Sequence, residues 1–322
     1  MVAGASISAD LSEPDWLNAL RALGNAHGSY SDLGSGHGAL FVEKGHDVLF
    51  VAFETVFGIR SGSETGVPLA FDVCESRNWS HLTLIAHRQS WFRDRNVFAF
   101  FDRLIDYDFF DQFDRVIFYG AGMCGYAAGA FSVAAPGASV LLAAPQATLD
   151  RTLSGWDSRF PSSRRMGFAD RYADASHLIA AADTAVILFD PDEIEDAMHA
   201  SLFRGPNVIH QRYRRGGAGA IESDLRAMSL VSKLADAAAA GDLTQAKVAH
   251  LLRARRRHVP YLRALLSRVL SEERPQLTRW LCRAVLAEQP LPRFQSHLER
   301  AEVQLGLRKP ETLDEETAES GS

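Results

Sequence analysis

Short apolar runs of strand length, separated by segments with helical spacing, constrain the fold of this chain more than any other feature. The runs are continuous rather than alternating, and they lie at 47–53 (DVLFVAF), 81–87, 115–119, 139–143 and 185–189. A strand that is apolar on both faces must be covered on both faces, as in parallel sheets with helical crossovers. This alternation therefore predicts an α/β fold with a mostly parallel sheet and helices on both faces.

The composition of the chain divides it into four expected regions. Residues 1–38 are predicted to form a short helix and a flexible loop rich in Gly, Ser and His. The α/β domain spans 39–240, and the polar stretch 148–183 within it is a candidate lid or insertion. Residues 241–308 have helical character and are expected to form a small all-helical appendage, whereas the acidic tail 309–322 is predicted to be disordered.

The overall charge and the cysteines exclude several classes of protein. The 322 residues are 47% hydrophobic and carry a net charge of −6, which gives no general electrostatic case for a nucleic-acid partner. The three cysteines, Cys74, Cys124 and Cys282, are far apart and predict no disulfide framework. The apolar runs are too short to span a membrane, and no basic segment with an apolar run opens the chain. We therefore expect a cytoplasmic protein.

Neither a cofactor nor a metal is predicted. Gly120 to Gly125 fits the spacing G-x-G-x-x-G, but no acidic residue ends a clear strand about 20 residues further on, and a Walker A lysine is absent. The histidines His27, His37 and His46 lie where no regular element fixes their spacing, so they do not predict a metal site.

The stretch 115–128, RVIFYGAGMCGYAA, is the most informative motif. An apolar strand runs into a glycine-dense turn, and a helix of small residues follows. This is the layout of a nucleophile elbow, G-x-S-x-G, in which small residues let strand and helix approach closely around a strained backbone turn. Backbone N–H groups at the start of such a helix can stabilise an oxyanion.

This motif resembles the elbow of bacterial α/β-hydrolase-like proteins of the serine-hydrolase superfamily, which reads approximately Y-G-S-S-M-G-G-Y-A-A. The residues that match are Tyr119, Gly120, Met123, Gly125, Tyr126, Ala127 and Ala128. Weaker matches, at 87–91, at 145–146 and at Asp196 with His199 and Ala200, extend the resemblance over roughly residues 40 to 235. The resemblance implies an α/β-hydrolase-like fold and a Ser-His-Asp triad.

The chain departs from the family pattern at two of the three triad positions. Gly122 stands at the nucleophile, and Cys124 stands where the family has a glycine. The segment 213–225, in which the histidine is expected, contains none, and Ala218 or Gly219 occupies that place. The acid alone has candidates, at Asp190, Asp192 and Asp196. Because loss of the nucleophile or the base removes most triad catalysis, the elbow is predicted to be degenerate.

Other residues offer a non-standard site. Cys124 becomes the nucleophile if the register shifts by two, and a helix N-terminus lowers a thiol pKa, although Tyr126 would then crowd the turn. The competing interpretation is a small buried cysteine. His210 is the nearest candidate base, although arginines surround it. His199, spaced for contact with Glu195 and Asp196, is expected to form a helical-surface pair.

Two basic clusters leave alternatives open. Arg212, Arg214 and Arg215, followed by two glycines, are either an anion-binding loop or a solvated basic loop. The run from Arg253 to His258 is either a solvated helix face or a site for phosphate or an acidic partner.

Two functional hypotheses result. The first is a pseudo-hydrolase that binds a small ligand or a protein, with the C-terminal helices as the interaction surface and neither a nucleic acid nor a membrane span involved. The second is a hydrolase or acyltransferase that uses Cys124, with His210 or His87 as its base.

Overall fold

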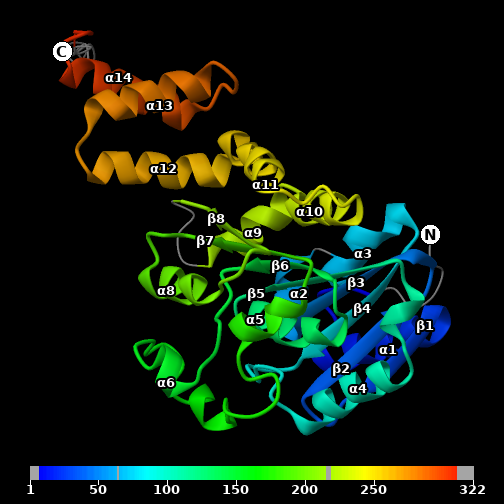
Figure 1. Cartoon of the computed structure of the whole chain (residues 1–322). Helices are drawn as coiled ribbons and strands as arrows, with labels where there is room; N and C mark the ends of the chain where they lie inside the picture. The colour runs from blue at the N-terminus through cyan, green and yellow to red at the C-terminus, as the bar shows by residue number, and fades with distance from the viewer. Residues whose placement is uncertain (1–6, 64, 215–218, 310–322) are drawn as a thin grey trace, which may run out of the picture. The chain divides into compact units, whose positions relative to one another are not determined.

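The computed structural model describes residues 7–63, 65–214 and 219–309. A single eight-stranded sheet dominates the described residues (Figure 1), in the order β1-β2-β4-β3-β5-β6-β7-β8. Its strands are β1 (Gly28–Asp32), β2 (His37–Val42), β3 (Gly45–Thr55), β4 (Trp79–Ala86), β5 (Arg115–Ala121), β6 (Ser139–Ala143), β7 (Thr184–Phe189) and β8 (Val208–Arg212). Strand β2 pairs antiparallel with β1 and β4, and every other pair is parallel.

Helices connect the strands and then continue beyond the sheet. They are α1 (Glu13–His27), α2 (Val56–Gly62), α3 (Leu69–Cys74), α4 (Arg95–Asp106), α5 (Met123–Phe131), α6 (Arg151–Ser154), α7 (Ala175–Leu178), α8 (Ile194–Leu202), α9 (Ala220–Ala227), α10 (Leu230–Ala239), α11 (Gln245–Leu251), α12 (Val259–Ser271), α13 (Pro275–Leu286) and α14 (Pro292–Gln304). The predicted α/β class, with a mostly parallel sheet and C-terminal helices, is confirmed.

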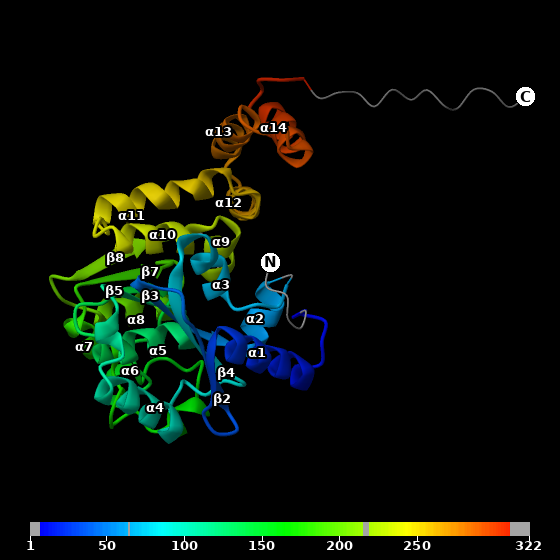
Figure 2. The same ribbon diagram turned by 90° about the vertical axis from the view of Figure 1, so that its right-hand side faces the viewer.

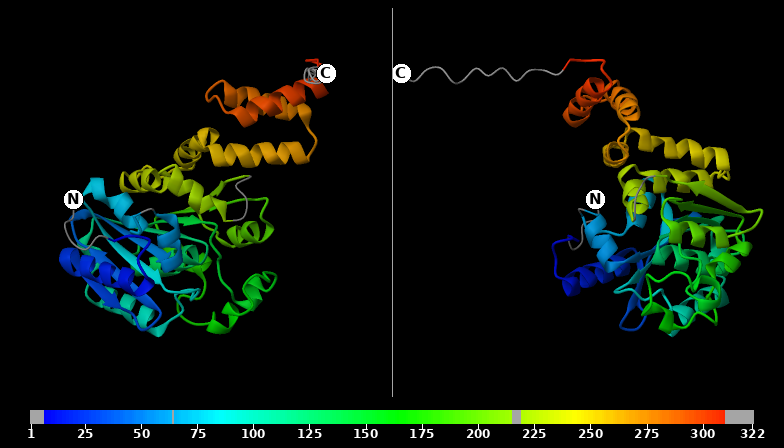
Figure 3. Two further views of the ribbon diagram at one scale, coloured as in Figure 1. Left: turned by 180° about the vertical axis from the view of Figure 1, so that it is seen from behind. Right: turned by 90° about the vertical axis from the view of Figure 1, so that its left-hand side faces the viewer.

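Apolar layers cover both faces of the sheet. On one face Phe53 of β3 stacks against Phe101 of α4 and Phe131 of α5, with ring centroids 6.1 and 5.7 Å apart. On the other face Trp16 of α1 and Ile59 of α2 are buried together. Figures 2 and 3 show the sheet between these two layers of helices. The continuous apolar runs of the central strands are explained by this double coverage.

The prediction of a flexible loop within residues 1–38 is wrong for most of that loop's length. Helix α1 extends to His27, and β1 follows at once, paired antiparallel with β2. Strand β1 reads GSYSD and lies at the edge of the sheet, where it is largely exposed. A polar edge strand carries no apolar signal, because its stability comes from backbone pairing rather than burial.

The chain separates into two compact units, 1–253 and 254–322. The first contains the sheet and includes α11, although the helical region was expected to begin at residue 241. The second contains α12, α13 and α14, which bury their own small core around Leu266, Cys282 and Phe294.

A buried ion pair ties the carboxyl end of β3 to α9. The Nη2 atom of Arg226 lies 2.6 Å from Oε1 of Glu54, and Oε2 of Glu54 accepts a hydrogen bond from the Leu69 N–H at 2.9 Å. Burial raises the pKa of Glu54, and Arg226 opposes that rise. Arg226 also contacts the more exposed Glu222 at 3.2 Å.

Replacing Arg226 with Met should lower the free energy of unfolding by about 3–5 kcal/mol, because it leaves a buried carboxyl group without its cation. The matched variant Glu222→Gln removes only the exposed partner of Arg226 and should cost less than about 1 kcal/mol. Urea unfolding of both variants tests this. Equal losses would show that the buried pair has no special role.

Candidate elbow site

The turn between β5 and α5 has the backbone geometry of a nucleophile elbow. Gly122 lies at its apex with φ 53° and ψ −124° and directly precedes the first residue of α5. Its N–H donates to the carbonyl oxygen of Ala143 at 2.9 Å, and its own carbonyl accepts from the N–H of Tyr126 at 2.9 Å. The strand–turn–helix context that the motif required is therefore present.

The glycines of the turn differ in why they are needed. A Cβ at Gly120 would lie 2.1 Å from the carbonyl oxygen of Cys124, so only glycine permits this approach of strand and helix. A Cβ at Gly125 would lie 3.1 Å from Cβ of Pro145. A Cβ at Gly122 would meet nothing within 4 Å. The apex therefore has room for a side chain, and packing does not explain its absence.

The start of α5 is where the motif would place its oxyanion-stabilising N–H groups. Its N-cap is Gly122, which offers no side chain to the first N–H groups of the helix. Met123 follows, partly buried, and its Sδ atom accepts a hydrogen bond from the N–H of Trp91 at 3.2 Å. The loop after β4 is thereby held against the first turn of α5.

Cys124 is buried in the first turn of α5, with 8% of its surface exposed. Burial raises the pKa of its thiol well above the usual value, and the carboxylates of Glu222 and Glu54 raise it further. No hydrogen bond joins Cys124 to a histidine in the described part of the chain. His210 lies on β8, separated from β5 by β6 and β7, and its Nε2 contacts the carbonyl oxygen of Ala200 at 2.9 Å.

The three candidate acids occupy different environments. Asp190 directly follows β7, is 1% exposed and accepts a hydrogen bond from the N–H of Asp192 at 2.9 Å. Asp192 is exposed to solvent. Asp196 lies within α8 and pairs with Nη1 of Arg159 at 2.7 Å. Asp190 is thus the candidate that sits at a strand end.

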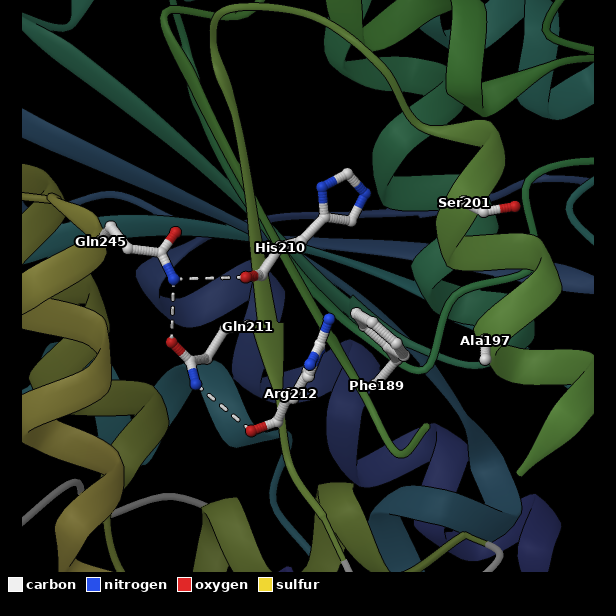
Figure 4. Close-up of a pocket in the computed structure, with 7 residues that line it drawn as sticks. All are labelled: Phe189, Ala197, Ser201, His210, Gln211, Arg212 and Gln245. Atoms are coloured by element: carbon white, nitrogen blue, oxygen red, sulfur yellow. Dashed lines mark hydrogen bonds between the residues drawn. The ribbon is translucent and has the colours of Figure 1, made fainter. Parts of the chain in front are cut away.

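His210 and Arg212 come together at the far edge of the sheet (Figure 4). They line a cleft of about 570 Å³, whose other lining residues are Phe189, Ala197, Ser201, Gln211 and Gln245. The side-chain amide of Gln245 donates to the carbonyl oxygen of His210 at 3.3 Å, across the outer edge of β8. Arg214 is exposed and does not line this cleft, and Arg215 and Ala218 lie outside the described residues.

The sequence did not predict the buried polar network around His199. His199 is fully buried, so the expected surface pair with Glu195 and Asp196 is wrong. Its Nδ1 accepts from the Ala147 N–H at 3.2 Å, which assigns the proton to Nε2, 2.9 Å from Oδ2 of Asp157. Asp157 and His199 lie 42 residues apart, and no local spacing links them.

Arg159 completes this network by contacting both Asp157, at 2.9 Å, and Asp196. Burial alone would raise the pKa of Asp157, but hydrogen bonds from Arg159 and His199 lower it to about 2. Burial lowers the pKa of His199 despite the neighbouring carboxylate. The network fixes the segment after β6 to α8.

A second pair that the sequence did not suggest joins His37 to Ser90. Nε2 of His37 lies 2.6 Å from Oγ of Ser90, and burial lowers the pKa of His37 to about 4. Trp91 and Phe92 follow with φ values of 56° and 52°, an uncommon conformation for bulky residues. His37 lies on β2, beyond β3 and β4 from the elbow strand, whereas Ser90 directly precedes Trp91, whose N–H contacts Met123 at the start of α5.

The described residues hold no grouping of three or more His, Cys, Asp or Glu side chains suited to a metal ion. None of their helices has the length and apolar composition that crossing a membrane requires.

Comparison with known proteins gives structural similarities only. No family model and no curated protein matches the chain. The carboxylesterase EstE1, from a metagenomic library, shares 14% identity over 74% of this chain and 99% of its own, with a TM-score of 0.41. An esterase of Pyrobaculum calidifontis shares 14% identity over 73% and 95%, with a TM-score of 0.41. The capsule O-acetyltransferase of Neisseria meningitidis serogroup A shares 12% identity over 62% and 92%, with a TM-score of 0.37.

Similarity of this degree says nothing about activity or substrate in this chain. The sheet, its two helix layers and the strained turn at Gly122 together form the α/β-hydrolase-like architecture that the sequence predicted.

Gly122→Ala should lower the free energy of unfolding by about 1–3 kcal/mol, because the new side chain has room but the backbone conformation disfavours it. Gly36→Ala is the matched control, since its Cβ also meets nothing within 4 Å and its φ lies outside the left-handed region. It should change stability by less than about 1 kcal/mol. Denaturant unfolding decides, and equal effects would mean that the apex is unstrained.

The protein should lose stability as the pH falls below about 6.5. Below this pH, His199 binds a proton in the unfolded chain but not in the folded protein, because folding lowers its pKa. Asp157 adds nothing in this range, because its folded-state pKa of about 2 keeps it charged. His199→Gln should flatten urea-unfolding profiles between pH 7 and pH 5, by at most about 1.4 kcal/mol per pH unit. The exposed-site control His177→Gln should leave the profile unchanged, and an unchanged profile in both variants contradicts the argument.

Proposed function

We propose that this chain is a catalytically degenerate α/β-hydrolase-fold protein, a pseudo-hydrolase that acts by binding a small ligand or a protein. The observation that carries the proposal is Gly122. It occupies the strained apex at which a nucleophile belongs, in a space open to a side chain, yet it has no atom that can attack a carbonyl group.

The missing base supports the same proposal. The sequence from Tyr213, just after β8, to Leu225 in α9 contains no histidine. His210 on β8 directs Nε2 at the carbonyl oxygen of Ala200 and away from any nucleophile described above. Asp190, one of the three candidate acids, follows β7, and an acid without base or nucleophile performs no acyl transfer.

The cleft beside β8 is the candidate small-ligand site. His210 and Arg212 line it together, and a guanidinium group favours carboxylate or phosphate ligands. The position of Arg212 in this cleft supports the anion-binding hypothesis for the arginine cluster, whereas Arg214 does not line the cleft. The absence of a cofactor and a cytoplasmic location stay predictions.

The alternative, a hydrolase or acyltransferase that uses Cys124, needs a thiolate. The raised pKa of the Cys124 thiol opposes that requirement, because burial and two nearby carboxylates favour the protonated form. The location of Cys124 at the start of α5 is the feature that favours this alternative.

Native protein at neutral pH should react selectively with neither a fluorophosphonate, which labels activated serines, nor iodoacetamide, which labels thiolates. All three cysteines are buried, and burial raises the pKa of each thiol. Peptide mass spectrometry reads out the sites, and urea-unfolded protein, alkylated at all three cysteines, is the control.

Rapid alkylation of Cys124 in the folded protein would overturn the proposal in favour of the cysteine enzyme. Fluorophosphonate labelling of Ser90 would also overturn it, by placing an active nucleophile at the His37–Ser90 pair.

A further inference from the structure

The described part of the second unit, residues 254–309, is basic within an acidic protein. Residues 254–309 contain twelve Arg and Lys but five Asp and Glu, whereas the whole chain carries a net charge of −6. Four of these acids already face arginines of the same unit. The pairs are Arg257–Glu288, Arg268–Glu272, Arg279–Glu302 and Arg308–Glu299. Residues 254–309 therefore carry an excess of positive charge that their own carboxylates do not neutralise, whereas residues 310–322 of the same unit add five acidic residues.

A groove of about 340 Å³ lies between α12 and α13. Its apolar floor is formed by Tyr261, Leu262 and Leu265 of α12 and by Leu281, Ala284 and Val285 of α13. On each helix these residues repeat at intervals of three or four, so they line up along one face. Ala284 is exposed, which leaves the floor accessible near the C-terminal end of α13.

Arginines border the same groove. Arg255 and Arg256 both line it, and the Arg255 guanidinium lies 5.4 Å from the centroid of the Tyr261 ring. Arg256 is exposed and forms no ion pair with any described residue. Glu288, which pairs with Arg257, also lines the groove, so the groove combines an apolar floor with two arginines and a carboxylate that already has a cation.

We propose that this groove binds an amphipathic, acidic helix of a partner protein. An apolar groove between two helices accepts leucine-like side chains spaced three and four residues apart. Aspartate or glutamate on the flank of such a helix would pair with the exposed Arg256, and arginine binds carboxylates through two parallel hydrogen bonds. The inference concerns the helical unit alone and holds whether or not the elbow is inactive.

Two other occupants fit the observations less well. Nucleic acid would use the positive charge but not an apolar floor, and Tyr261 is buried beneath Arg255 rather than open for base stacking. The acidic residues 310–322 of this chain contain Leu313 as their one large apolar residue, which provides no row of side chains for the groove.

The full-length protein would be titrated into a fluorescein-labelled peptide of about five helical turns, with leucines along one face and glutamates on its flank. Fluorescence anisotropy should show binding, and a peptide with lysines in place of the glutamates should bind at least about tenfold more weakly. Ala284→Glu fills the floor with a charge, and Arg256→Glu reverses the rim. Each should weaken binding at least about tenfold.

The controls match these changes outside the groove. Ala264→Glu places the same charge on an exposed part of α12, and Arg293→Glu reverses an exposed cation of α14. Both should leave affinity within about threefold. Circular dichroism of all four variants verifies folding.

Three results would overturn the proposal. Equal weakening by Arg293→Glu and Arg256→Glu, together with competition by single-stranded oligonucleotide, would indicate a general polyanion surface. A gain of about tenfold on deletion of residues 310–322 would identify the tail as the occupant. Absence of binding to the acidic peptide would remove the site.

Discussion

The close approach of β5 to α5 is the contact on which the rest of the site depends. At Gly120 the strand backbone packs directly against the carbonyl of Cys124, with no space for a single carbon atom between them. This contact forces the chain to reverse within one residue, and Gly122 takes up the strain. Hydrogen bonds from Gly122 to Ala143 and from Tyr126 to Gly122 then hold the turn against β6 and the helix. The positions of the neighbouring strand ends, Asp190 among them, follow from the register of this sheet.

Sequence predicts the central strands well because their environment is uniform. Each is covered on both faces, so its apolar run is continuous and independent of its neighbours. Strand β1 was not predicted, for the opposite reason. An exposed edge strand is held by backbone pairing, so its amino-acid composition is hardly constrained. Helix α11 shows a similar limit, because helical spacing says nothing about which unit a helix joins.

The candidate site divides in the same way. The glycines of the turn were predictable because strand, turn and helix are contiguous in the chain. The environment of Cys124 was not, because the carboxylates that raise its thiol pKa belong to β3 and α9. The partner of His199 lies in the irregular stretch between β6 and β7, so its burial against Asp157 is visible only in three dimensions. Local geometry can be predicted from motifs, whereas electrostatic surroundings depend on long-range packing.

The empty apex at Gly122 sets what kind of signal such a protein can give. A pseudo-hydrolase of the kind proposed above would form no acyl intermediate, so its ligand would leave chemically unchanged. The fraction of protein with ligand bound would then follow the free ligand concentration, because no ligand is consumed by a reaction. By mass action, the same occupancy adds to the stability of the fold in proportion to the logarithm of ligand concentration once the site is saturated. The stability of the folded protein would therefore report the concentration of its ligand, and the protein would persist longer where the ligand is abundant.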